Sequence, residues 1–200
     1  MPAADARPAP VSFTRKGARQ SLRFASNPAH ELPNFKTTKD DMLSAPATVA
    51  ECAAEEESLM LDHLTAIDAM GIGQSISKLA LQLFPGRPVA VHLETDEHPL
   101  FVHFMDGTGA GNADWIVKKK NVTRRFGRSS WMIRLEFLER QADFHTETGL
   151  DANLFRAEGG AVPLVVRDQG RVGTLVVSGL QGWEDHALAV AGMKLWASES

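Results

Sequence analysis

The sequence of 200 residues contains one cysteine, Cys52, and this scarcity excludes several kinds of site. A single cysteine forms no internal disulfide and cannot supply a multi-cysteine zinc or iron–sulfur centre, and such low usage is typical of a reducing compartment. The sequence also lacks any apolar run long enough to cross a membrane. We therefore expect a soluble cytoplasmic protein with no membrane partner.

An excess of positive charge is also absent. The formal net charge is −4, which argues against bulk electrostatic binding of nucleic acid, so we expect no nucleic-acid partner. Hydrophobic residues make up 44% of the chain and charged residues 23%, a composition that supports a packed core.

Residues 1–46 lack a sustained apolar periodicity and hold six of the ten prolines. Residues 1–40 carry seven cations and three acids, a net charge of +4, so with −4 for the whole chain residues 41–200 carry −8. We interpret residues 1–46 as a mobile, basic, proline-containing tail and residues 47–200 as a single domain. Two other interpretations of the tail stay open: an organelle transit peptide, or an upstream start codon before a natural first residue at Met42.

Helical and strand patterns alternate from Thr48 onward. A helix is expected from Thr48 until Gly71 and Gly73 break it, followed by further helices over 74–84, 112–125 and 129–141 and from Trp183 to the end. Strands are expected over 89–95, 100–105, 161–166 and 172–180, in two hairpins. Paired hairpins imply an antiparallel sheet, and strands that are apolar on both faces imply helices on both sides. The expected fold is α+β, a three-layer α-β-α sandwich.

Two histidines of the first hairpin form one candidate site. A four-residue turn over 96–99 pairs Val91 with Phe104, and it places His92 opposite His103 at about 5 Å between their Cβ atoms. Such a pair either shares a metal ion, supplies an axial ligand to haem iron, or is partly solvated beside Glu94 with no ligand.

Complete catalytic motifs are missing, although fragments of them are present. The residues around Ser178 lack the G-x-S-x-G pattern of a nucleophile elbow, and the glycines of the GTGAGN stretch, residues 107–112, match no dinucleotide or phosphate-loop motif. Asp185 and His186 stand at the start of the last helix, where they either bind a metal, haem or a substrate or only stabilise the junction.

A basic cluster occupies residues 118–134, and no acidic residue lies between Trp115 and Arg134. Lys120, Arg124 and Arg128 are four residues apart, so they share a face if the helix is continuous, and like charges at this spacing destabilise a helix. An acidic partner subunit, an anionic ligand such as haem with its propionates, or simple solvation would offset this cost.

Several of these stretches together resemble a known family. The residues concerned are Asn112 with Trp115 and Lys118–Lys120, then Arg128-Ser129-Ser130, Gly159-Gly160 with Pro163, Val172-Gly173, Val177-Ser178-Gly179-Leu180 and Asp185-His186. Over about residues 47–196 the chain resembles the haem-degrading-domain family, the HbpS-like and GlcG-like group, and within it a little-characterised branch of small cytosolic proteins. The resemblance implies a profilin-like or PAS-like fold, a homo-oligomer, and relatives that bind haem, iron or cobalamin-related ligands.

We therefore expect a small-ligand-binding protein, with haem or a metal-tetrapyrrole as ligand, held by histidine ligation and by cations that neutralise its carboxylates. The candidate ligand-binding residues are His92, His103, His186, Asp185, Arg124, Arg128, Lys120 and Asn112, and the three histidines are also the metal candidates. No catalytic residue is assigned. The alternatives are a cofactor-free protein-interaction or stress-response module and an oxygen-dependent haem-degrading enzyme.

Overall fold

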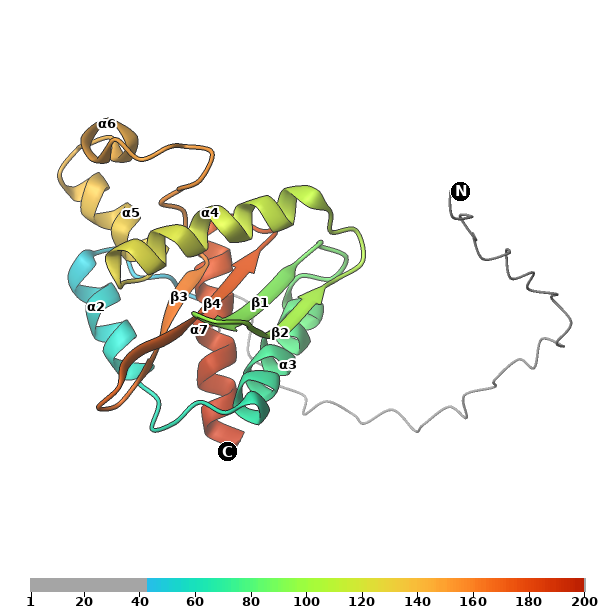
Figure 1. The fold of residues 1–200 in the computed structure, drawn as a ribbon. Helices are drawn as coiled ribbons and strands as arrows, with labels where there is room; N and C mark the ends of the chain where they lie inside the picture. The colour runs from blue at the N-terminus through green and yellow to red at the C-terminus, as the bar shows by residue number, and fades with distance from the viewer. Residues whose placement is uncertain (1–42, 200) are drawn as a thin grey trace, which may run out of the picture. The chain divides into compact units, whose positions relative to one another are not determined.

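A four-stranded antiparallel sheet with the strand order β2-β1-β4-β3 forms the centre of the protein (Figure 1). The computed structural model describes residues 43–199. The strands are β1 (Ala90–Thr95), β2 (Pro99–Phe104), β3 (Ala161–Val166) and β4 (Gly170–Ser178). The helices are α2 (Val49–Ser58), α3 (Ala66–Leu83), α4 (Ala110–Phe126), α5 (Ser130–Glu139), α6 (Phe144–Thr148) and α7 (Gly182–Glu199).

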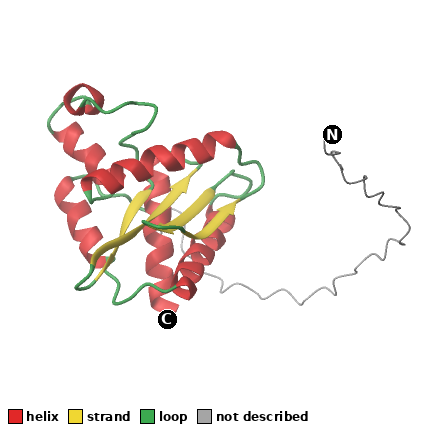
Figure 2. Cartoon of the chain, viewed as in Figure 1, coloured by secondary structure: helices red, strands yellow, loops and turns green. Residues whose placement is uncertain are grey.

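Helices cover both faces of this sheet, as the apolar strands predicted. In Figure 2, α4 crosses one face, and α3 and α7 lie against the other. Val91, Leu93 and Val177 face α3 and α7 in the main core, whereas Ala90 and Val176 pack with Ile116 of α4. The expected α+β sandwich with a central antiparallel sheet is confirmed.

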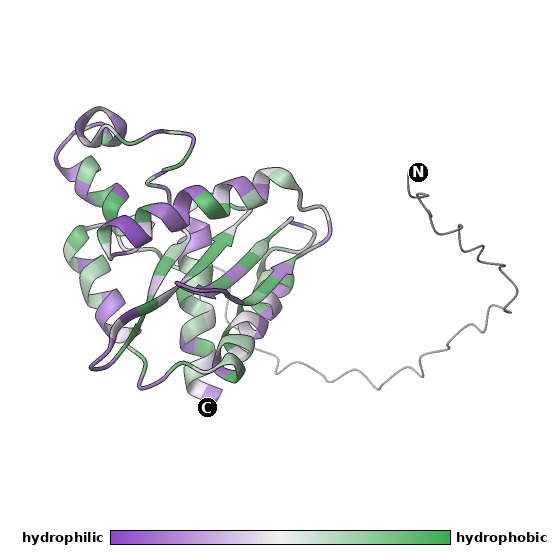
Figure 3. Cartoon of the chain, in the orientation of Figure 1, coloured by the Kyte–Doolittle hydropathy of each residue, from purple (hydrophilic) through white to green (hydrophobic). Residues whose placement is uncertain are grey.

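The hydropathy colouring agrees with this layering. Figure 3 shows hydrophobic residues along the middle of the strands and hydrophilic residues at the hairpin turns and along part of α4. No helix in residues 43–199 is long and apolar enough to cross a bilayer.

Most of the expected tail, residues 1–42, lies outside the described residues. Among the rest, Leu43 is buried in the main core, and the Pro46 carbonyl accepts a hydrogen bond from the Trp131 indole. Packing against the domain is therefore present a few residues before Ala47.

The predicted helix break at Gly71 and Gly73 was wrong. The chain instead leaves helical conformation after α2 and starts α3 at Thr65, whose side chain and that of Asp68 form a reciprocal capping box. Gly73 lies inside α3 and faces the Phe101 ring of β2. A Cβ atom at this position would collide with that ring, so the position requires glycine. This glycine allows close packing between helix and strand, which a local pattern does not reveal.

The predicted register of the first hairpin was also wrong. β1 ends at Thr95 and β2 begins at Pro99, so three residues rather than four join them, and the Thr95 N–H donates to the His98 carbonyl at 2.9 Å. The register also shifts at a bulge between Leu93 and Glu94. His103 consequently pairs with Val91, and His92 with Val102. Because side chains alternate along a strand, this shift places His92 and His103 on opposite faces of the sheet. They do not form a shared metal site.

Candidate functional site

A pocket of about 540 Å³ lies where the start of α4, the end of β4 and the start of α7 meet. This volume is within the range of small-molecule sites in proteins. The lining residues come from those three elements and from two side chains of the α5–β3 region. The polar ones among them are Asn112, Lys119, Arg134, Glu158, Ser178, Gln181 and Asp185. The lining is polar on several sides, and this favours a ligand with charged or hydrogen-bonding groups.

A buried ion pair forms one side of this pocket. The Lys119 Nζ lies 2.6 Å from the Asp185 Oδ2, and the two side chains are only 4% and 1% exposed. Lys119 also donates to the Val177 carbonyl at 3.3 Å, and the Leu180 N–H donates to Asp185 at 3.0 Å. These contacts hold both charged groups in place, since a buried charge without partners is strongly destabilising.

Burial raises the pKa of the Asp185 carboxyl above its ordinary value, and this effect outweighs the opposing ones. The Lys119 ammonium and the backbone N–H of Leu180 favour the charged form, but they only partly offset the loss of water. Perturbed carboxyl groups in a pocket are typical of functional sites.

Gly160 makes the close approach around this ion pair possible. Its φ is +121°, a conformation that side-chain-bearing residues rarely adopt. A Cβ atom at this position would collide with the Val177 carbonyl and would lie 2.9 Å from the Asp185 Cβ and 3.0 Å from the Lys119 Nζ. Gly160 therefore leaves room for the Lys119–Asp185 pair.

Asn112 fixes the wall of the pocket at the start of α4. Its Nδ2 donates to the Pro88 carbonyl at 3.2 Å and to the Ser178 carbonyl at 3.4 Å, while its Oδ1 accepts from the Gly109 N–H at 3.1 Å. One side chain thus joins the start of α4 to the approach to β1 and the end of β4. Ser178 takes part through its carbonyl, which agrees with a structural turn.

Trp115 and Arg134 lie at more accessible parts of the lining. Trp115 is 39% exposed, and the Lys119 ammonium lies 5.9 Å from its ring centroid. Arg134 forms an ion pair with Glu158, and both side chains are about one-third exposed. The pocket thus combines an aromatic surface with two ion pairs, one buried and one partly exposed.

The other expected basic residues lie away from this pocket and contact acids of the same chain. Glu94 accepts from His92 at 2.7 Å and from Lys120 at 3.0 Å, and it forms an ion pair with Arg124 at 2.9 Å. Arg128 follows the end of α4 and pairs with Glu136 of α5. The acidic residues that offset the charges of Lys120, Arg124 and Arg128 therefore belong to the same chain.

The Glu94 network lowers the pKa of that carboxyl. Burial by itself would raise it, but hydrogen bonds from His92 and Lys120 and the charges of Lys120 and Arg124 outweigh burial. From the sequence Glu94 is only a neighbour of the histidines, and its contacts with the three candidates His92, Lys120 and Arg124 depend on the fold.

The three candidate histidines occupy three separate environments. His92 belongs to the Glu94 network, His103 bonds to the Ser77 hydroxyl at 2.8 Å, and His186 is fully buried and bonds to Glu55 at 2.8 Å. None of them lines the pocket. Of the eight candidate residues, the structure brings Asn112 and Asp185 together there.

Sequence reasoning missed Lys119, Trp115, Arg134 and Glu158 as pocket residues. A signal for two of them was available, since Asn112, Trp115 and Lys119 are spaced by three and four residues and share one face of a helix. Arg134 and Glu158 are brought to the pocket by the fold of the α5–β3 region, and no local pattern connects them.

Comparison with known proteins identifies relatives of the whole domain. A UPF0303 protein of Streptomyces avermitilis is 37% identical over 149 residues, which cover 74% of this chain and 90% of that protein. The crystal structure of the Ybr137w protein superposes with a TM-score of 0.72 at 28% identity, over 77% of this chain and 90% of that one. The structure of a PduOC–haem complex has the same fold, with a TM-score of 0.54 at 17% identity over 66% of this chain and 93% of that one.

A family model described as haem degrading protein HbpS-like matches residues 64–194. This range contains all four strands and every residue named for the pocket. The predicted resemblance is confirmed: the chain belongs to the HbpS-like family.

Proposed function

We propose that the pocket between α4, β4 and α7 binds a small anionic ligand, and that this ligand belongs to the haem and tetrapyrrole class. The observation that carries the proposal is the buried Lys119–Asp185 pair at the side of a pocket of about 540 Å³. The ligand class is supported by the family description and by the haem-bound PduOC structure of the same fold.

The lining residues suit the two chemical parts of such a ligand. The half-exposed Trp115 indole offers an apolar surface to a planar ring. The ammonium of Lys119 and the guanidinium of Arg134 offer charge-assisted hydrogen bonds to carboxylates. Arg134 would then exchange its contact with Glu158 for one with the ligand.

The Trp115 ring and the two cations are the proposed contacts for the ring and the carboxylates of haem, whereas none of the three candidate histidines lines the pocket to ligate the iron. Iron would supply redox or ligand-binding chemistry in a bound haem. Binding through the pocket residues, in contrast, depends on charge and ring contact. An iron-free porphyrin is therefore expected to bind about as well as haem. Histidine ligation by His92, His103 or His186 is the competing proposal.

Titration with haem and with iron-free protoporphyrin, followed by absorbance and tryptophan fluorescence, distinguishes binding in the pocket from histidine ligation. Arg134→Gln is expected to weaken both ligands by about 10-fold to 100-fold, the worth of a charge-assisted hydrogen bond. Arg125→Gln is the matched control, because Arg125 is an exposed cation on the same helix as Lys119 and lies outside the pocket lining. Trp115→Leu is expected to weaken both ligands as well.

Two outcomes contradict pocket binding. One is haem binding that is lost in a single histidine-to-alanine variant while protoporphyrin does not bind. The other is equal affinity of wild type, Arg134→Gln and Trp115→Leu. Addition of a reductant to the haem-loaded protein tests the enzymatic alternative, since degradation would remove the haem absorbance.

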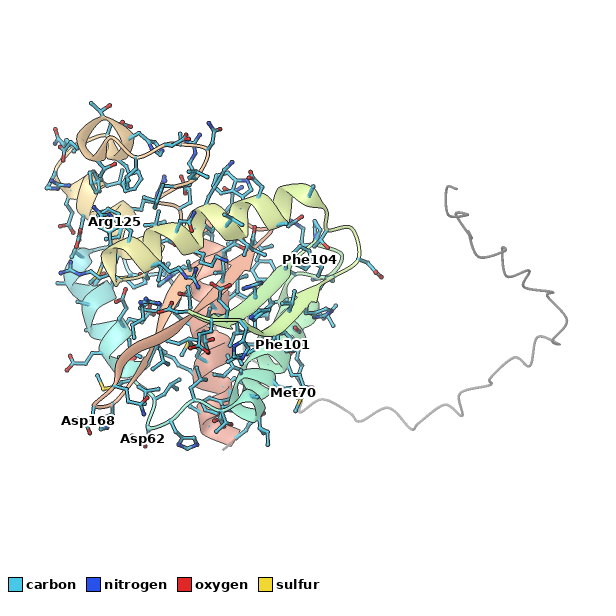
Figure 4. The ribbon with its side chains drawn as sticks, viewed as in Figure 1. Asp62, Met70, Phe101, Phe104, Arg125 and Asp168 are labelled. Carbon is cyan, nitrogen blue, oxygen red and sulfur yellow. The ribbon has the colours of Figure 1, made fainter. Side chains whose placement is uncertain are left out.

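A homo-oligomer is the second part of the proposal, and the edge strand β2 supports it. Val102 and Phe104 are 50% and 40% exposed on the sheet face that α4 covers over the other strands. Figure 4 labels Phe104 at the end of β2. An apolar edge strand is a ready site for pairing with another chain. A cofactor-free interaction module would use the same surface.

The mass in solution tests this assembly. Light scattering is expected to give a multiple of the chain mass for wild type and a smaller mass for Val102→Lys. Ile67→Lys, at an exposed apolar residue of α3, is the control and is expected to leave the mass unchanged. A monomeric wild type contradicts the proposal.

A further inference from the structure

A second cluster of reactive side chains lies between α2 and α7, apart from the pocket. Cys52 and Glu55 are one helical turn apart on α2, and His186 comes from α7. One donor atom from each of the three lies within 4.8 Å of the others. None of these residues lines the pocket, so the cluster is independent of the proposed ligand site.

Asp185 and His186 are adjacent in the sequence, but their side chains point in different directions. Successive residues of a helix point about 100° apart. Asp185 contacts Lys119 of α4, whereas His186 contacts Glu55 of α2. The two side chains of the Asp185-His186 dipeptide therefore contact two different helices, α4 and α2.

His186 carries a polar atom that the described protein leaves unsatisfied. Its side chain is 0% exposed, its Nε2 lies 2.8 Å from the Glu55 Oε2, and its Nδ1 is buried with no hydrogen-bond partner in residues 43–199. Buried polar atoms without a partner are rare in folded proteins, and a bound ion or water is a common explanation. The Nε2 faces the cluster, since it contacts Glu55, and the described residues satisfy only one of the two ring nitrogens.

We propose that Cys52, Glu55 and His186 form a binding site for a divalent transition metal, with zinc as the best match. A thiolate, an imidazole and a carboxylate are the three ligand types that zinc takes in proteins, and hard cations such as magnesium prefer oxygen alone. Zinc–ligand distances of 2.0–2.3 Å in a tetrahedron separate the donor atoms by about 3.3–3.8 Å. Donors that already lie within 4.8 Å of one another need only small side-chain movements to reach this geometry.

Three protein ligands leave a fourth position for water or an exogenous ligand, as in sites that exchange their ligands. Cys52 is completely buried and Glu55 is 12% exposed, so a metal reaches the cluster along the Glu55 side chain. Lys194 lies 3.8 Å from the other Glu55 oxygen and is half-exposed, so its ammonium can turn to solvent when the metal binds. Metal binding displaces the thiol proton of Cys52 to solvent, and the thiolate then ligates.

Cobalt(II) gives a direct optical test, because a thiolate–cobalt bond produces a charge-transfer band in the near ultraviolet. Cys52 is the one cysteine of the sequence, so within a single chain this band reports ligation by Cys52. The full chain, treated with a chelator, is titrated with Co²⁺ and then with Zn²⁺ in competition. We expect one metal per chain, a thiolate band that zinc abolishes, and no band in Cys52→Ser.

Glu55→Gln and His186→Gln are expected to weaken Co²⁺ by at least about 10-fold, the loss that even an outer-shell partner causes. His103→Gln is the matched control, because it removes a histidine whose ring bonds to Ser77 and leaves the cluster intact. Circular dichroism establishes that each variant is folded. If His186→Gln does not fold, the partly exposed Glu55 provides the deciding variant.

Saturating Co²⁺ without a thiolate band in wild type overturns the proposal. So does a band of unchanged affinity in Glu55→Gln and His186→Gln. In either case the cluster is a buried hydrogen bond that joins α2 to α7, and the porphyrin titration of the pocket is unaffected.

Discussion

The Lys119 ammonium lies 2.6 Å from the Asp185 carboxylate and joins α4 to α7 beside the end of β4. Several positions around this pair belong to the stretches that carry the family resemblance, namely Asn112, Gly160, Ser178 and Gly179. A buried ion pair is seldom the most stable way to fill a core, since apolar residues of similar volume do as well or better. The pair is therefore better explained by the pocket that it lines.

Removal of one member of this pair is expected to destabilise the fold strongly. Lys119→Met and Asp185→Asn should each lower the free energy of unfolding by about 3–5 kcal/mol, because each leaves the other group buried without its partner. The double variant should lose much less than the sum of the two single losses. Urea denaturation of the four proteins measures this, and additive losses would contradict the coupling.

Gly160→Ala is expected to disturb the same region through the backbone. The substitution combines a φ of +121° with a collision at the Val177 carbonyl, so its cost should exceed the about 1–3 kcal/mol of conformational strain alone. Gly86→Ala is the control, because Gly86 also has a positive φ, +75°, but has no atom within 4 Å of an added Cβ. Equal thermal stability of the two variants would show that space around Gly160 is unimportant.

Stability at acidic pH is expected to depend on Glu94. Its pKa in the folded protein lies below the ordinary value of 4.5, so its stabilising effect is complete above that value and is lost as the pH falls through the lower folded pKa. Glu94→Gln should therefore be less stable than wild type at pH 7, and the difference should shrink toward pH 3. Urea midpoints of both proteins across this range test the sign, and a difference that grows on acidification would refute it.

The thiol of Cys52 is expected to react slowly in the native protein. Burial raises its pKa to about 12, and the side chain is 0% exposed, so both the thiolate and the access that alkylation requires are scarce. Iodoacetamide labelling followed by mass spectrometry should be slow in buffer and fast in urea. Equal rates in the two conditions would place Cys52 on an accessible surface.

Elements whose signals are local were predicted well. The apolar strands of the second hairpin, the basic helix α4 and the helix that starts near Trp183 all appear close to their expected bounds. The five-residue helix α6 was missed, because a single turn begun by the Asp143 cap has too few positions to show a period. The register predicted for the first hairpin was wrong for a related reason, since a turn of three residues and a bulge shift the register while leaving the apolar alternation of each strand unchanged.

For the candidate site, the sequence indicated which residue types and which segments of the chain are involved, but not which side chains contact one another. The basic run of α4 and the Asp185-His186 pair were recognised, yet Lys119 turned out to meet Asp185, and Lys120 to meet Glu94. These pairs are 66 and 26 residues apart, and neighbouring lysines on one helix reach different acids because they point in different directions.

The sequence by itself determined the class of fold and the family, because strand alternation, caps and short motifs act over a few residues. It also determined that Cys52 has no disulfide partner within the chain. Only the tertiary structure decided that the histidines are separated, that Lys119, Lys120 and Arg124 of α4 are paired with acids, and that Asn112, Lys119 and Asp185 line one pocket, with Gly160 beside the Lys119–Asp185 pair. Those relationships depend on strand register and on how closely helices approach the sheet, and both are set by contacts between residues far apart in the chain.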